Sequence, residues 1–244
     1  MGTKYDVLKT AVDRGVERYA SVDLLRAGVQ AIPLVGGAID TVLSGRASHL
    51  QLARLDRFIG QLHARLSNVE AVVVDVSSDE FVDFIVTCLD RASRARTPEK
   101  SQRFSDIVAT QVSQSRPWDE ADMATRLLND LEDIHMSVLR AALTAPPGTN
   151  PFAGIKVVAL TSQATDMLLD GLSVSLVSEL GNQYSIVSLR LACSELTGRG
   201  LLRDEGVGRW DAPAMTYFAA TDLAMWLAGW INSTTENWAE SSQP

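Results

Sequence analysis

The sequence predicts a mostly α-helical protein, in which a helical bundle is followed by a winged-helix domain with a small β-ribbon. Apolar residues recur at three- and four-residue steps through most of the chain, as the buried face of a helix requires. The stretch 184–231 instead reads as helix, tight turn, strand, glycine turn, strand and helix. With 244 residues, 46% hydrophobic and 21% charged, the chain has a globular composition and the length for two modest domains. We expect a helical domain over 1–118, a long connecting helix plus the winged-helix domain over 119–235, and an acidic tail over 236–244.

The segment 27–45 is apolar, contains several glycines and carries one charged residue, Asp40. A membrane-spanning helix needs about 20 apolar residues, and the proline and glycine pair within this segment would interrupt one. Two interpretations remain open. The segment is either a buried hairpin of two short helices or an amphipathic or re-entrant segment at a membrane, where glycines allow close helix contact. The residues that would carry a membrane- or self-associating role are Ile32, Pro33, Leu34, Gly36 and Gly37.

Five helices are expected between the apolar segment and residue 180. The first has a regular apolar stripe opposite several arginines. A serine followed three residues later by a glutamate has capping-box spacing, and a Thr-Pro pair supplies an N-cap and a first-turn proline. The expected helices are 47–67, one beginning at Ser77, one beginning after Thr97, a long one from Asp119 to about Leu143, and 163–180. A further helix is expected before the apolar segment, over 5–26.

The winged-helix prediction rests on turn and cap residues in 184–231. The glycines of Gly198-Arg199-Gly200 stop the helix expected over 184–198, because glycine readily takes the left-handed backbone of a C-cap. Residues 201–205 and 215–219 can pair as two short strands around a glycine turn. Thr221 then offers an N-cap for the closing helix. The predicted buried face of the 184–198 helix is Ile186, Leu189, Cys193 and Leu196.

The net charge of −8 falls on the second half of the chain. Residues 1–118 hold 15 basic and 14 acidic side chains (15 − 14 = +1), whereas residues 119–244 hold 7 and 16 (7 − 16 = −9). Affinity for duplex DNA comes largely from basic groups that neutralise phosphates, so this distribution disfavours nucleic-acid binding by the winged-helix domain. A DNA-binding transcriptional regulator is retained as the alternative function, with Arg190, Arg203 and Arg209 as its candidate contacts.

One basic cluster stands out in the first half of the chain. Its simplest interpretation is a solvated surface that balances neighbouring acids. Its functional interpretation is contact with acidic lipid or with the acidic half of a second copy, which would assist self-association. The cluster consists of Arg91, Arg94, Arg96, Lys100 and Arg103.

No sequence pattern identifies a catalytic residue, a metal site or a cofactor. His49, His63 and His135 fall on three different predicted segments or faces, without a second ligand at helical spacing. No phosphate-binding glycine loop and no nucleophile elbow is present. Cys88 and Cys193 lie on predicted apolar faces, where a free thiol behaves as a small hydrophobe. We therefore expect a non-enzymatic protein without a cofactor, and the sequence identifies no small-molecule substrate.

Three stretches of the chain are similar to those of a known family. They are RFSDIVATQV at 103–112, LLNDLEDIHMSVL at 127–139 and ATDLAMWL at 220–227. In this order they resemble the Abi-alpha family of bacterial abortive-infection proteins, in which a glycine-bearing apolar segment precedes helices and a similar tail. The chain departs from the family at Ala224, where such tails often have glycine, and in a long insert over 145–163. The resemblance implies a role in defence against phage and transfers no catalytic residues.

Together these observations predict a non-enzymatic phage-defence protein of abortive-infection type. Its helical half would associate with a membrane or with itself, and its acidic winged-helix half would bind a protein partner. The first residues lack the apolar core of a signal peptide, so we expect a cytoplasmic protein, with peripheral contact at the inner membrane as an option for 27–45. The expected partner is a protein or a second copy of the chain.

Overall fold

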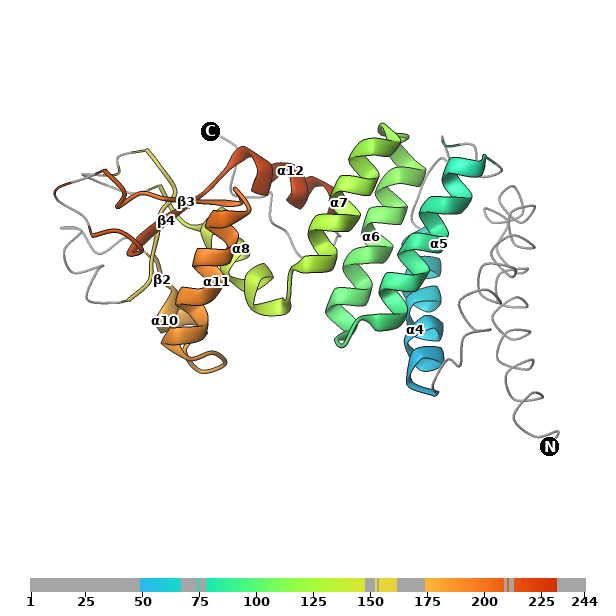
Figure 1. The fold of residues 1–244 in the computed structure, drawn as a ribbon, viewed down its shortest axis with the longest axis horizontal. Coiled ribbons are helices and arrows are strands. Elements are labelled where there is room, and N and C mark those ends of the chain that lie inside the picture. Colours follow the sequence, from blue (N-terminus) through green and yellow to red (C-terminus); the bar gives the residue numbers. More distant parts are fainter. Residues whose placement is uncertain are drawn as a thin grey trace. The chain divides into compact units, whose positions relative to one another are not determined.

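The computed structural model describes residues 49–66, 74, 78–147, 152, 154–161, 174–208, 210 and 213–231. These residues form eight helices and a small sheet of four strands, which confirms the prediction of a mostly α-helical protein. The chain divides into two compact units, Met1–Asp130 and Leu131–Pro244 (Figure 1). The predicted helix over 5–26 and the apolar segment 27–45 lie outside the described residues.

The described part of the first unit is a bundle of α4 (His49–Leu66), α5 (Asp79–Arg94), α6 (Pro98–Gln114) and α7 (Trp118–Asp130). Helix α6 packs against the other three, and α5 and α7 also pack against each other (Figure 1). Phe104, Ile107 and Val108 of α6 are fully buried, as the sequence predicts. The rings of Phe84 and Trp118 join α5 to α7, with centroids 5.8 Å apart. Burial of these side chains is the main stabilising term of the bundle.

Side-chain caps fix where two of these helices begin. The predicted cap of α5 at Ser77 is replaced by Ser78, whose Oγ accepts a hydrogen bond from the backbone N–H of Phe81 at 3.2 Å. This corrects the start of the helix by one residue. The cap of α6 is confirmed, because Thr97 Oγ1 accepts from the N–H of Lys100 at 3.2 Å and a proline follows in the first turn.

The structure contradicts the single long helix expected over 119–143. Helix α7 ends at Asp130, and a second helix, α8 (Asp133–Thr144), begins after Glu132. The backbone N–H of Glu132 donates to Nδ1 of His135 at 2.9 Å, and the two residues form a capping box that starts the new helix. The break coincides with the division between the two compact units at 130/131.

The described part of the second unit combines the sheet with α8 and three further helices, α10 (Leu176–Leu180), α11 (Ile186–Gly198) and α12 (Asp222–Ile231). The strand order is β2-β1-β4-β3, with β1 parallel to β2 and with β4 antiparallel to both β1 and β3. Helix α8 packs against α11, β4 and α12. The strands are β1 (Val158–Ala159), β2 (Val174–Ser175), β3 (Leu202–Asp204) and β4 (Tyr217–Ala220).

The predicted pairing of 201–205 with 215–219 is confirmed by β3 and β4, in which Arg203 lies opposite Ala219. The helix predicted over 163–180 is wrong at its described end. Residues 174–175 form β2 instead, because Val174 pairs with Val158 of β1, and the described helix in this stretch is α10. A two-residue strand inside an apolar run has no alternation that a sequence pattern would reveal.

Candidate functional site

Helix α11 is fixed at both ends by local sequence signals. Ser185 Oγ accepts a hydrogen bond from the N–H of Ser188 at 3.1 Å at its start. At its end Gly200 has φ of 73°, and the N–H of Leu201 donates to the carbonyl oxygen of Leu196 at 2.9 Å. This is the glycine stop that the sequence predicts, and it turns the chain directly into β3.

One face of α11 is buried and the position of Ile186 corrects the prediction. Leu189, Cys193 and Leu196 are fully buried, as expected, and α11 packs there against α8 and β3. Ile186 is 43% exposed instead of buried, because as the first residue of the helix it lies at the edge of this face.

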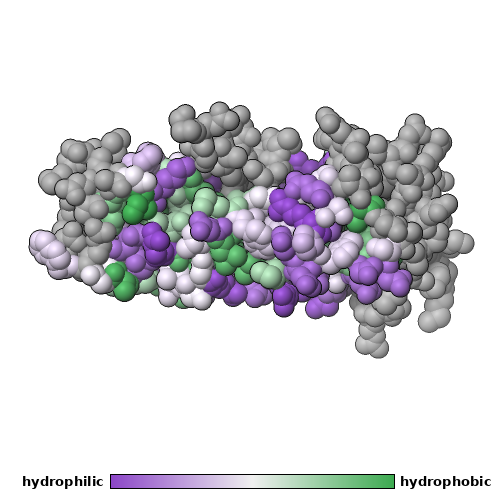
Figure 2. Space-filling view, turned by 90° about the horizontal axis from the view of Figure 1, so that it is seen from above, coloured by the Kyte–Doolittle hydropathy of each residue, from purple (hydrophilic) through white to green (hydrophobic). Residues whose placement is uncertain are grey.

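The opposite face of α11 carries an exposed apolar ridge. The side chains of Val187 and Leu191 are 73% and 59% exposed, one helical turn apart, and Ser194 and Gly198 continue the same line. We call Val187, Leu191, Ser194 and Gly198 the α11 ridge. Hydrophobic side chains, green in Figure 2, reach the surface of the second unit among hydrophilic ones. Contiguous exposed apolar side chains mark binding surfaces more often than scattered ones do.

Sequence reasoning missed the α11 ridge although its signal was present. A helix with apolar residues on one face has a solvated opposite face. Here valine and leucine recur four residues apart on the side away from the predicted core. Comparing both faces of the predicted helix would have identified them.

His135 joins α11 to α8. Its Nδ1 accepts the N–H of Glu132, so the proton of the neutral ring lies on Nε2, which donates to Glu195 Oε2 at 2.8 Å. His135 is buried, whereas the Glu195 carboxylate is part-exposed at the edge of the α11 ridge. The histidine thus has a structural role, and it holds one charged side chain in a defined place beside the ridge.

The turn between β3 and β4 is closed by one carboxylate. Asp204 Oδ1 accepts from the N–H of Gly206 at 2.9 Å, and its Oδ2 accepts from the N–H of Met215 at 2.6 Å. Asp204 therefore clamps both ends of this turn. Beyond the clamp the turn exposes Val207 and the ring of Trp210, which is 98% exposed.

The three arginines of the DNA-binding alternative are not gathered on one described surface. Arg190 is exposed beside the α11 ridge. Arg203 forms an ion pair with Glu205, which offsets its charge. Arg209 lies outside the described residues.

The basic cluster of the first unit is divided between the surface and the interior. Lys100 and Arg103 are buried on α6, and the Nζ of Lys100 donates to the carbonyl oxygen of Asn129 at 2.8 Å. Arg94 forms an exposed ion pair with Asp90 at 2.8 Å. The described surface of the cluster is therefore carried by Arg91, Arg94 and Arg96 alone.

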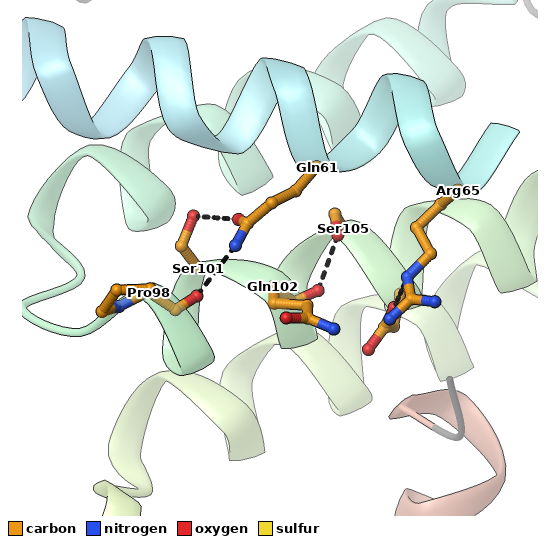
Figure 3. Close-up of polar contacts among 7 residues, drawn as sticks. Gln61, Arg65, Pro98, Ser101, Gln102 and Ser105 are labelled. Atoms are coloured by element: carbon orange, nitrogen blue, oxygen red, sulfur yellow. Dashed lines mark hydrogen bonds and ion pairs between the residues drawn. The ribbon is translucent and has the colours of Figure 1, made fainter. Parts of the chain in front are cut away.

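Polar contacts join α4 to α6 (Figure 3). Gln61 donates to the carbonyl oxygen of Pro98 at 3.1 Å and accepts from the hydroxyl of Ser101 at 2.9 Å. One turn further along α4, Arg65 forms an ion pair with buried Asp106 at 2.6 Å between Nε and Oδ1. Paired in this way, the buried carboxylate of Asp106 ties α4 to α6 rather than forming an open site.

The described residues offer little chemistry for catalysis or metal binding. Among them no group of three His, Cys, Asp or Glu side chains is placed to hold a metal ion. Burial raises the pKa of both the Cys88 and the Cys193 thiol from 9.0 to about 12, so neither is a reactive thiolate at neutral pH. His49 and His63 have no described side-chain environment.

The residues predicted to contact a membrane, Ile32 to Gly37, lie outside the described residues. Within the described part of the chain, every helix is too short or too polar to cross a bilayer. Comparison of the chain with protein-family models, curated proteins and solved structures gives no match.

Proposed function

We propose that this protein is a non-enzymatic binding protein whose second unit captures a protein partner through the α11 ridge. The supporting observation is the exposure of Val187 and Leu191 at the centre of the solvent-facing side of α11. Covering such side chains with a complementary apolar surface is favourable, because it removes nonpolar area from water.

The order of elements in the second unit supports a winged-helix arrangement, which we also propose. Helix α8, β1, β2, α10, α11, β3 and β4 follow one another along the chain, and β4 lies between β1 and β3. In that arrangement α11 would be the recognition helix. A DNA-reading helix presents basic and amide groups to phosphates and base edges, whereas the α11 ridge is apolar and has one arginine beside it. The composition of this face therefore favours a protein over DNA.

The biological setting that we propose is abortive infection. It is supported by the sequence resemblance to the Abi-alpha family, which covers stretches in both units. In this proposal the glycine-bearing segment 27–45 gives the first half its membrane- or self-associating role. Replacing Gly36 and Gly37 with leucine would abolish that role, and flotation and dye release with anionic liposomes would measure it.

The proposal is tested by challenging bacteria that produce the full chain with phage. Leu191→Asp should lose protection while keeping the wild-type melting temperature, because it places a charge on the ridge without touching the core. Met225→Asp is the matched control, since Met225 is 55% exposed on α12 away from the ridge. Full protection by a folded Leu191→Asp variant would overturn the proposal that the α11 ridge binds the partner.

A further inference from the structure

We propose that the partner seated on the α11 ridge is a second copy of this chain, in a parallel two-fold pair of α11 helices. This inference rests on the proposed function, because it names the occupant of the same surface. It follows from the spacing of the ridge and from the charges beside it.

The spacing of the α11 ridge is that of a short coiled-coil seam. Its residues are separated by four, three and four positions, as the successive a and d positions of a heptad repeat are. The first two, Val187 and Leu191, supply the apolar side chains. The last two, Ser194 and Gly198, are small, so the backbones of two such helices can approach closely near the end of the seam.

The charges beside the ridge match a second copy and fix its direction. Arg190 and Glu195 are exposed on opposite sides of the ridge, five residues apart. In a parallel pair these are the two flanking positions that face each other across the seam, so Arg190 of each copy meets Glu195 of the other. An antiparallel pair brings flanking residues of the same side together, which sets arginine against arginine and glutamate against glutamate. The remaining flanking residues, Ser188 and Thr197, are uncharged.

His135 positions Glu195, the acidic residue of this ion pair. Its hydrogen bond to Glu195 Oε2 holds the carboxylate at the edge of the ridge before a partner arrives. Less ordering of this side chain is then needed on binding. The seam is shorter than two heptads, so we expect weak, concentration-dependent association of the kind seen for interfaces below about 1,200 Å².

The first measurement is sedimentation of the full chain over a wide concentration range. Wild type should pass from monomer to dimer, and Leu191→Asp should weaken the association by roughly tenfold or more, as loss of a central interface residue does. Met225→Asp should associate like wild type. A wild-type chain that stays monomeric at roughly millimolar concentration, or a dimer that Leu191→Asp leaves intact, would overturn the inference.

The second measurement traps the parallel geometry as a disulfide. In a parallel pair residue 194 of each copy meets its own counterpart, so Ser194→Cys should form a covalent dimer under mild oxidation. Ser178→Cys, on the exposed side of α10, is the matched control and should cross-link much more slowly. Both native thiols are buried and should stay unreacted. Equal cross-linking of the two variants would overturn the parallel seam.

The third measurement tests the charge pairing by mixing two variants. Arg190→Glu and Glu195→Arg chains should each associate more weakly than wild type, because like charges then face each other. Mixed together they should form a heterodimer in which both pairs again join opposite charges. A mixture no more associated than the separate variants would contradict the pairing. If the chain is monomeric but Leu191→Asp still loses phage protection, the proposed function stands and the occupant is a different protein.

Discussion

Two arginines of the first unit form ion pairs that differ in burial. Arg65 and Asp106 are both largely buried, whereas Arg94 and Asp90 are exposed. Removing Arg65 takes this ion pair from a buried carboxylate, so we expect Arg65→Ala to lower the free energy of unfolding by about 3 kcal/mol. Arg94→Ala, the matched control, should lower it by less than about 0.5 kcal/mol. Urea denaturation of both variants measures the difference, and equal losses would show that the Arg65 pair contributes no more than a surface pair.

The buried thiols give the protein an alkaline sensitivity. Burial raises the pKa of Cys88 and Cys193 from 9.0 to about 12, so the folded chain keeps protons that the unfolded chain releases. The stabilisation is fully present below pH 9 and is lost as pH rises from 9 toward 12, by roughly 1 kcal/mol per pH unit for each thiol. Denaturation at pH 8 and pH 10 measures this slope. Replacing both cysteines with alanine should flatten it, and an unchanged slope would assign it to other groups.

At the scale of the element, the β3–β4 turn depends on a close backbone approach. A Cβ added at Gly206 would collide with the carbonyl oxygen of Pro213, whereas one added at Gly60 in α4 would have no atom of the described residues within 4 Å. Gly206→Ala should therefore destabilise the protein by about 2 kcal/mol through backbone displacement at the Asp204 clamp. Gly60→Ala should stabilise it by up to about 1 kcal/mol, because alanine favours the helix. Thermal melting compares the two variants, and a Gly206→Ala melting temperature at or above wild type would contradict the close approach.

The elements that the sequence predicted well are those with both periodicity and a cap. Thr97 and Thr221 begin α6 and α12, and Gly200 ends α11, because each residue satisfies backbone groups by a local contact. The break at Glu132 was missed, because glutamate is not a preferred N-cap and the apolar spacing of α7 continues through Leu131 into α8. Its capping partner, His135, is not the Glu or Gln that a capping box normally has at this position, and its role is visible only from the hydrogen bond in the structure.

The candidate site was less predictable than the fold. Burial of Lys100 and Arg103 depends on helices that pack from elsewhere in the chain, so a run of basic residues in the sequence did not reveal which side chains reach the surface. Sequence periodicity identified Leu189 and Cys193 as core, but the same periodicity predicts a polar opposite face. The exposed Val187 and Leu191 break that rule, as residues at functional surfaces often do.

At the scale of the whole molecule, charge opposes binding to nucleic acid. The chain carries a net charge of −8, and the exposed face of α11 offers one arginine, Arg190. We therefore expect no binding of a short duplex DNA at low salt, measured by fluorescence anisotropy. Salt-dependent binding that weakens in Arg190→Ala would contradict this prediction and favour the transcriptional-regulator alternative.

The helix break at the unit boundary also bears on how such a chain can evolve. Each unit is one continuous stretch of sequence, and the backbone passes between them once, at Asp130 and Leu131. A single genetic crossover at this point would exchange one complete unit and leave both hydrophobic cores whole. The α11 ridge, together with the Glu195 and His135 that lie beside it, would be inherited intact with the second unit.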